Sequence, residues 1–234
     1  AQPDYASGAP PVHIRTTMKH GGVLYVAGEA PAEPVTGPKV MIVTPALEEE
    51  EAKQSSESVY GGTIREKAQV LKGGIGGMVK EAAGLGGLSL DSCYVTTLIK
   101  WLLPRAQRNK PSKEAVEWGM PALADEIREQ KPDIIIAMGK VVFDQLVDMK
   151  LTQTDALGAW FWSKAYQCRV FLMDKPILLL MKPEKLETFR LLFKEVRNML
   201  DRIDGTSMTT VETNYRYLRK IEDLRQLIDE IQHK

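Results

Sequence analysis

The residues with the clearest capacity for chemistry are basic, and they lie together in KWLLPRAQRNKPSK at positions 100–113. This stretch holds five Lys or Arg side chains and no acid. Such cations contact nucleic-acid phosphates, and an aromatic ring beside them can stack on a base. The stretch therefore predicts contact with a nucleic acid, and a solvated basic loop with a buried tryptophan is the alternative. The residues expected to make the contact are Lys100, Trp101, Arg105, Arg108, Asn109 and Lys110.

Acidic residues gather in a run of four glutamates at positions 48–51, shortly after the apolar run VMIV at 40–43. A carboxylate in such a place can activate water or stabilise a cation. Glu48 and Glu49 are the candidates for that role. The alternative is a solvated turn whose negative charges favour the start of a helix.

Cysteine and histidine content excludes several kinds of site. The two cysteines, Cys93 and Cys168, are 75 positions apart and form no CxxC motif, so this chain alone cannot hold an iron–sulphur cluster. The three histidines, His13, His20 and His233, all lie near an end of the chain. A histidine-centred catalytic triad or a histidine-ligated metal in the core is therefore not expected, and we predict neither a metal nor a cofactor.

Composition indicates an ordinary soluble globular protein. The chain has 234 residues, of which 44% are hydrophobic, and its 31 basic and 31 acidic residues cancel. Any contact with nucleic acid must therefore come from a local basic patch and not from net charge. No apolar run is long enough to span a membrane and the start does not read as a signal peptide, so we expect an intracellular protein.

Short apolar runs alternate with helical patterns along the chain. The runs expected to form strands do not alternate with polar residues, which is typical of a parallel sheet covered on both faces. The expected strands are 23–27, 40–43, 93–99, 133–138, 169–173 and 176–181. The expected helices are 63–84, with a pause at GGIGG (73–77), and 110–130, 140–147 and 183–203.

These elements predict a three-layer α/β/α fold with a central parallel sheet of about four strands. Ligands of such folds bind beyond the carboxyl ends of the strands. The segments that should carry chemistry are therefore those after Val43, Ile99, Met138 and Met181.

Three regions follow from changes in composition. Residues 1–37 read as an irregular arm, residues 38–204 as the α/β domain, and residues 205–234 as a polar linker followed by a strand and a helix. The last region is either a helix that packs back on the domain or the start of a second domain.

Four segments in order resemble the uracil-DNA glycosylase superfamily, and most closely its iron–sulphur branch. VGEAPGEEE of that branch is matched by KVMIVTPALEEEE (39–51), and YITNVVKCRPP by YVTTLIKWLLP (94–104). Its KPKVIVALG is matched by KPDIIIAMG (131–139), and its THPS by LMKPEKL (180–186). GEAPAE at 28–33 copies the first motif but precedes the strand, so we interpret it as a coincidence.

The departures from the family pattern bear on activity. Pro45 stands where the family has the acid that positions water, Thr97 where it has an asparagine, and Lys182 where it has a histidine. Trp101 replaces a cysteine that ligates the cluster. The resemblance implies a base pocket, and its residues here would be Thr44, Pro45, Thr97, Gly139 and Pro183.

The end of the chain carries a second resemblance. NYRYLRKIEDLRQLIDEI at 214–231 is similar to the opening strand and helix of the proofreading-exonuclease domain in family A DNA polymerases. Some bacteriophage polymerases of that family look like a glycosylase-like module joined to such a start. This resemblance implies that the chain is the amino-terminal module of a polymerase, acting in the cytoplasm of an infected host if a phage encodes it.

We therefore expect a DNA-binding, glycosylase-like module of DNA replication or repair that has lost ordinary uracil excision. Its partners would be DNA and other domains or subunits of a polymerase, with Lys140 and Lys182 adding phosphate contacts. The first alternative is an active glycosylase for uracil or a modified pyrimidine, in which Glu48 or Glu49 steers water and Lys182 acts on the abasic product, even as an amine nucleophile. The second alternative is a domain that binds small molecules and no nucleic acid.

Overall fold

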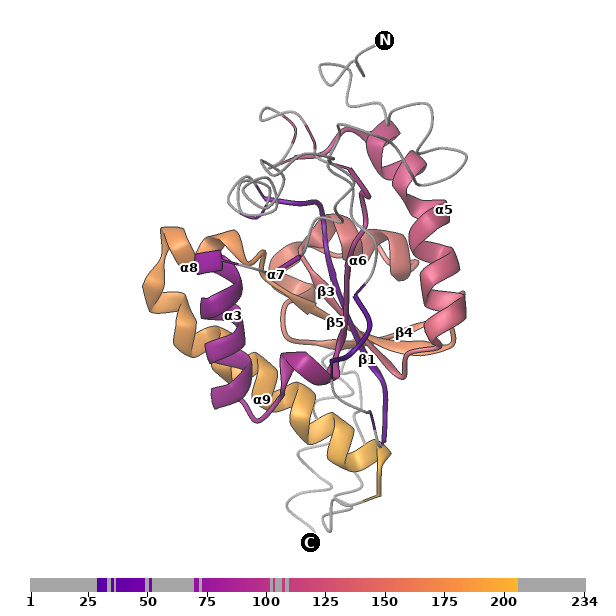
Figure 1. Cartoon of the computed structure of the whole chain (residues 1–234). Coiled ribbons are helices and arrows are strands. Elements are labelled where there is room, and N and C mark those ends of the chain that lie inside the picture. The colour runs from indigo at the N-terminus through magenta and orange to yellow at the C-terminus, as the bar shows by residue number, and fades with distance from the viewer. Residues whose placement is uncertain are drawn as a thin grey trace, which may run out of the picture.

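The computed structural model describes residues 29–32, 35, 37–48, 51, 70–71, 73–101, 103, 107 and 110–205. At its centre is a five-stranded sheet with the strand order β2-β1-β3-β5-β4 (Figure 1). Four strands are parallel, and β4 pairs with β5 in the antiparallel sense. The predicted α/β fold with about four parallel strands is therefore confirmed. The strands are β1 (Val40–Thr44), β2 (Tyr94–Thr97), β3 (Ile134–Met138), β4 (Trp160–Ser163) and β5 (Cys168–Met173).

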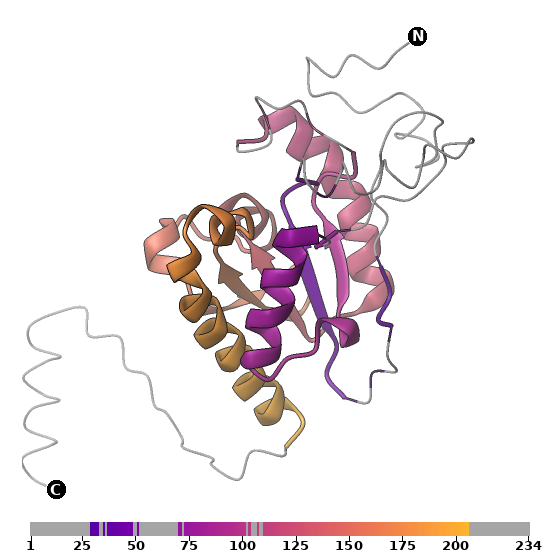
Figure 2. The same ribbon diagram turned by 60° about the vertical axis from the view of Figure 1, so that its left-hand side comes forward.

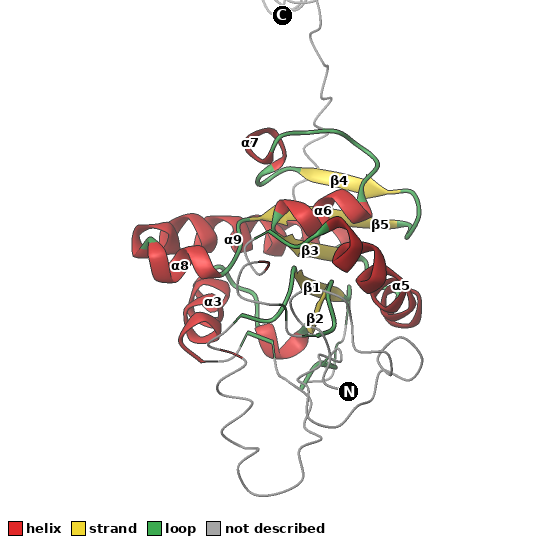
Figure 3. Ribbon diagram, turned by 90° about the horizontal axis from the view of Figure 1, so that it is seen from above, coloured by secondary structure: helices red, strands yellow, loops and turns green. Residues whose placement is uncertain are grey.

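Helices cover both faces of this sheet, as the view from above shows (Figure 3). One core cluster joins the sheet to α3, α8 and α9, and the other joins it to α5 and α6. In Figures 1 and 2 the magenta α3 and the orange α9 lie side by side. The helices are α3 (Gly73–Leu85), α5 (Lys113–Gln130), α6 (Lys140–Leu146), α7 (Gln153–Ala156), α8 (Ile177–Met181) and α9 (Leu186–Ile203), with the 3-10 turns η2 (Leu90–Ser92) and η3 (Pro183–Lys185).

Burial on both faces explains why the strands show no polar alternation. Within β1, Val40 and Ile42 face the α3 and α9 layer, whereas Met41 and Val43 face the α5 and α6 layer. All five residues of β1 and all five of β3 are buried. A strand buried on both sides needs an apolar residue at every position, as the runs at 40–43 and 134–138 have.

Local signals fix the ends of α5. The Ser112 hydroxyl accepts a hydrogen bond from the Ala115 amide at 3.2 Å, which is an N-cap as the sequence predicts. At the other end Lys131 adopts a left-handed conformation (φ 49°), and its amide donates to the Ile127 carbonyl. That turn sends the chain into β3.

GGIGG forms the start of α3, whose first residue is Gly73. A Cβ on Gly76 would lie 1.8 Å from the Leu71 carbonyl oxygen, so only glycine allows this approach. A Cβ on Gly77 would meet nothing within 4 Å. The close approach at Gly76 is to the backbone of Leu71, which precedes the helix.

The predicted strands differ from the observed ones at two places. Residues 176–181 form the helix α8 and not a strand, so β5 is the last strand of the sheet among the described residues. The strand β4 was not expected. Trp160 of β4 packs on Phe171 of β5 with ring centroids 4.5 Å apart, which accounts for its aromatic character.

Several predicted regions lie outside the described residues. These are the strand at 23–27, the predicted helix at 63–69, most of the arm at 1–37 and the tail from residue 206 onward, whereas Val70 and Leu71 are bends. Among the residues that the structure describes, no helix is both long enough and apolar enough to cross a bilayer.

Candidate functional site

The carboxyl ends of β1, β2, β3 and β5 meet at one edge of the sheet, because these strands are parallel and adjacent. Hydrogen bonds extend the pairing beyond the strands. The Leu98 amide donates to the Thr44 carbonyl at 2.8 Å, and the Gly139 amide donates to the Met173 carbonyl at 2.9 Å. The loops that leave this edge are therefore held in register, as a ligand site on such a fold requires.

Pro45, Gly139 and Lys175 come together at this edge from three different loops. Gly139 has φ 118°, which favours glycine. A Cβ at Gly139 would lie 3.0 Å from Lys175 Cγ and 3.3 Å from Pro45 Cγ. The stem of Lys175 therefore runs over the backbone of Gly139, beside the ring of Pro45.

Glu48 is the acid whose charge acts on Lys175. Burial lowers the pKa of the Lys175 ammonium, and the attraction of Glu48 raises it, with burial the larger effect. The loop after β1 and the loop after β5 thus place a carboxylate and a half-buried amine at the same edge. The sequence predicts Glu48 as a candidate but does not single out Lys175.

Glu51 holds the loop that carries Glu48. Its carboxylate is buried and accepts hydrogen bonds from the Glu48 amide at 2.8 Å and from the Leu71 amide at 2.5 Å. One member of the glutamate run is therefore a structural carboxylate and not part of a solvated turn. Glu49 lies outside the described residues.

The Thr side chains at the edge lie under the loops. The Thr97 hydroxyl donates to the Ile99 carbonyl at 2.7 Å and is fully buried. The Thr44 hydroxyl oxygen is buried, and no hydrogen bond to it is found among the described residues. Both candidates lie at strand ends, and their part in a base pocket stays a prediction.

Lys100 and Trp101 require a correction, because both are buried and not at a DNA-facing surface. The Lys100 side chain is 1% exposed, and its ammonium donates to Thr96 Oγ1 and to Glu126 Oε2, both at 2.5 Å. Trp101 is also 1% exposed. A phosphate cannot reach Lys100 unless this ion pair opens, and a base cannot stack on Trp101.

Lys182 and Pro183 also require a correction, because they do not follow a strand. They lie after the helix α8, and both are exposed. The Lys-Pro pair that follows the last parallel strand is Lys175–Pro176, two residues after Met173. The expected position at the sheet edge therefore belongs to Lys175.

The remaining basic candidates differ in their surroundings. Lys110 is exposed just before α5. Lys140 begins α6, where it pairs with Asp144 and lies 5.6 Å from the centroid of the Phe143 ring. The other candidates of this stretch, Arg105, Arg108 and Asn109, lie outside the described residues.

Asp174 anchors the segment that presents Lys175. Its buried carboxylate accepts a hydrogen bond from Gln153 Nε2 at 2.6 Å and pairs with Lys185 Nζ at 3.4 Å. These contacts tie the end of β5 to α7 and to η3. Gln153, Asp174 and Lys185 were not predicted as part of the site.

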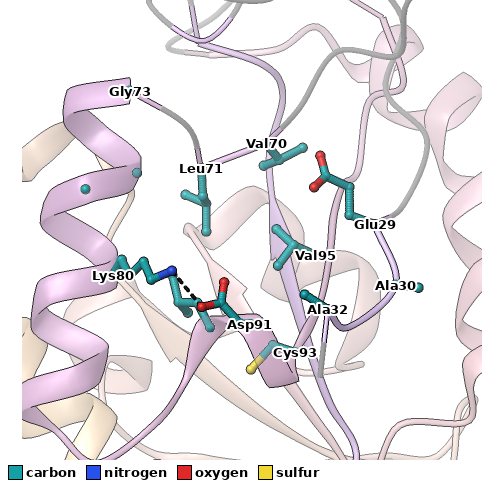
Figure 4. Close-up of a pocket in the computed structure, with 13 residues that line it drawn as sticks. Glu29, Ala30, Ala32, Val70, Leu71, Gly73, Lys80, Asp91, Cys93 and Val95 are labelled. Carbon is teal, nitrogen blue, oxygen red and sulfur yellow. Dashed lines mark hydrogen bonds and ion pairs between the residues drawn. The ribbon is translucent and has the colours of Figure 1, made fainter. Parts of the chain in front are cut away.

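A separate hollow lies beside β2, bordered by α3 (Figure 4). Glu29 pairs with Val95 as an isolated antiparallel bridge there, and Lys80 of α3 pairs with Asp91 at 2.6 Å. The described part of this motif, Glu29–Ala32, therefore lies beside β2, and its interpretation as a coincidental match stays a prediction. Because two strands lie between β2 and β5, this hollow is distinct from the site at the carboxyl end of β5, where Lys175 lies.

The sequence matches the family model of the uracil DNA glycosylase superfamily over residues 30–200. The chain belongs to the uracil DNA glycosylase superfamily. The match spans the sheet and every strand end described above. No curated protein matches the chain.

The residues of this glycosylase-like chain do not fit the iron–sulphur cluster that one branch of the superfamily carries. Trp101 fills a core position where that branch has a cysteine. Cys93 and Cys168 belong to the two core clusters on opposite faces of the sheet, so they cannot ligate one group. Burial also raises the pKa of each thiol to about 12, which opposes the thiolate that iron requires.

Proposed function

We propose that this chain is a DNA-binding module on the glycosylase fold that does not carry out ordinary uracil excision. The observation that carries the proposal is the end of β1. Pro45 lies there against Gly139 and Lys175, in the place where the family resemblance puts the acid that positions water. A proline side chain has no group that can accept a proton or orient water.

The DNA contact is proposed for the loop between β2 and α5. Lys110 is exposed there, and Arg105, Arg108 and Asn109 belong to the same stretch of sequence. Lys and Arg neutralise phosphates and release counterions, so the affinity should fall steeply with salt. Lys100 and Trp101 are not part of this proposed contact, because the ion pair and the core hold them.

We also propose a replicative or repair context, in which residues 1–37 form an arm, 38–204 the glycosylase-like domain and 205–234 the link to an exonuclease domain. The support is the resemblance of 214–231 to family A DNA polymerases, which include bacteriophage enzymes. The motif order that resembles the iron–sulphur branch supports descent from that branch with loss of the cluster.

An active glycosylase is the second candidate, because one carboxylate remains at the edge. Glu48 follows β1 by four residues, and its charge reaches Lys175 of the β5 loop. In this scheme Glu48 would take the role of positioning water that Pro45 cannot fill. Excision would then be lost in Glu48→Gln while the fold remained intact.

A single-turnover assay separates the two candidates. The chain is incubated with labelled oligonucleotides that contain uracil or a modified pyrimidine, single- and double-stranded, and band shifts are recorded on the same samples. The proposal expects a shifted band and no strand break after alkali. If wild-type protein instead creates an alkali-labile site, and Glu48→Gln does not, the chain is the active glycosylase of the second candidate.

A second experiment locates the DNA contact. The logarithm of DNA affinity falls with the logarithm of salt concentration. Replacing Arg105, Arg108 and Lys110 together by Gln should make this fall less steep by about 2.7, which is roughly 0.9 for each of three lost phosphate contacts. Lys164→Gln is the matched control, because Lys164 is exposed in the β4–β5 hairpin at the opposite end of β5. An unchanged slope in the triple variant would refute this location, and no DNA binding at low salt would favour a small-molecule domain.

A further inference from the structure

Lys175 follows the carboxyl end of β5 and lies against Gly139, the first residue beyond β3. Its neighbours come from separate loops. Lys175 Cγ and Cε would lie 3.0 and 3.5 Å from a Cβ at Gly139, and Pro45 closes the other side. The stem of Lys175 therefore lies over Gly139 and beside Pro45, at the end of the sheet where ligands of such folds bind.

The loop that carries Lys175 is itself anchored. Asp174, the residue before it, is 5% exposed and is held by Gln153 and Lys185. Pro176, the residue after it, is buried at the start of α8. A reactive amine must be held at a set position against its target, and this chain holds the backbone of Lys175 on both sides.

We propose that Lys175 is a nucleophile that captures the aldehyde of an abasic site in DNA as a covalent imine. This inference rests on the proposed DNA binding at the carboxyl edge of the sheet, and it does not need the chain to excise a base. The substrate class is DNA that has already lost a base, whose ring-opened sugar exposes an aldehyde at C1′.

The step balances without any further reactant. The neutral Lys175 amine adds its electron pair to C1′, and the carbonyl oxygen takes a proton to give a carbinolamine. With the first amine proton now on that oxygen, the hydroxyl leaves with the second amine proton as one water molecule, the C–O bond breaks and a C=N bond forms. The reverse addition of water releases the DNA, so the capture is reversible until a hydride reduces the imine.

The surroundings of Lys175 favour the neutral form that this step consumes. Burial lowers the pKa of its ammonium, so a larger fraction is free amine near neutral pH than for a solvated lysine. Glu48 acts in the other direction, because a carboxylate stabilises the ammonium. Glu48→Gln should therefore lower this pKa further and speed the capture at pH 7, which a purely structural role of Lys175 would not produce.

Borohydride trapping tests the proposal on the whole chain. The probe is a labelled oligonucleotide with an abasic site, and the control probe carries a tetrahydrofuran residue, which has no aldehyde. We expect a protein–DNA band that resists denaturation with the abasic probe and none with the control probe. Lys175→Ala and Lys175→Arg should both abolish the band, because a guanidinium does not form the imine, whereas Lys182→Ala should keep it.

Band shifts on the same variants separate the possible failures. If wild-type protein binds the abasic probe but gives no trapped band, the inference is overturned and the proposed function stands. If the band persists in Lys175→Ala, the reactive amine is another group and the inference is likewise overturned. If neither probe is bound at low salt, the proposed function fails, and the inference fails with it.

Discussion

The buried ion pair of Lys100 and Glu126 should dominate the stability of the loop after β2. Lys100 is 1% exposed on its side chain, and Glu126 is 17% exposed. The ammonium donates to the Glu126 carboxylate and to Thr96, whose own hydroxyl donates to the same carboxylate at 2.8 Å. Glu126→Gln keeps the shape of this triangle but removes the charge that compensates a buried ammonium.

The expected cost of Glu126→Gln is about 3 kcal/mol, at the lower end of what breaking a buried pair costs, because Glu126 is partly exposed. That cost corresponds to a loss of roughly a hundredfold in the folding equilibrium constant. Lys100→Met should cost less, because the remaining carboxylate can reach water and the methionine fills the space of the stem. Chemical denaturation of the two single variants and the double variant measures the coupling between the two side chains.

The pH dependence gives an independent check. Burial lowers the pKa of the Lys100 ammonium below its ordinary value of 10.5, against the attraction of Glu126. The unfolded chain therefore binds more protons between the two pKa values, and the free energy of unfolding falls as pH is lowered through that window. Glu126→Gln should extend the fall to lower pH, with the double variant as the reference without Lys100. A cost below about 1 kcal/mol for Glu126→Gln, with no such extension, would show that the ammonium is not desolvated.

Three further tests, at α3, at α5 and at the two cysteines, probe the packing. Gly76→Ala should destabilise by about 3 kcal/mol or more, because its Cβ would lie 1.8 Å from a backbone carbonyl oxygen, whereas the adjacent Gly77→Ala should stabilise α3 by up to about 1 kcal/mol in the same denaturation assay. Ser112→Ala should cost about 1 kcal/mol, since it removes the N-cap of α5, and Ser112→Asp should retain most of that stability. Burial raises the pKa of both Cys93 and Cys168 to about 12, so an aromatic disulfide reagent at pH 8 should label neither thiol until denaturant unfolds the chain. Rapid labelling of the folded chain would contradict that burial.

The sheet was predictable because its strands are buried on both faces. Runs such as IIIAM (134–138) have no polar residue to mark a solvent side, and helical patterns follow the strands, which together favour a parallel sheet. The same criterion failed at PILLLM (176–181), where an apolar run of six residues has no periodicity that separates a strand from a short helix. Pro176 at the helix start was the available signal, since proline is favoured at the beginning of a helix.

That one error moved the candidate site by seven positions. With 176–181 taken as a strand, the last strand end fell at Met181 and drew attention to Lys182, whereas β5 ends at Met173 and presents Lys175. Charge alone also gave a wrong prediction for Lys100, because the sequence of a basic stretch does not show which of its residues pairs with an acid from a distant helix. Glu126 lies 26 residues further along the chain, and only the packing of α5 on the sheet brings it to Lys100.

The roles of the groups at the carboxyl ends of the strands can be distinguished, because each proposed step requires a different chemical group. DNA binding requires exposed cations such as Lys110, excision would require a carboxylate such as Glu48, and capture of an aldehyde requires the Lys175 amine. Glu48→Gln is the decisive variant, because it must abolish any excision yet accelerate capture by removing the charge that raises the pKa of Lys175 against the effect of burial. A variant that slowed both would mean that Glu48 positions the DNA or the loop, and neither chemistry could then be assigned to it.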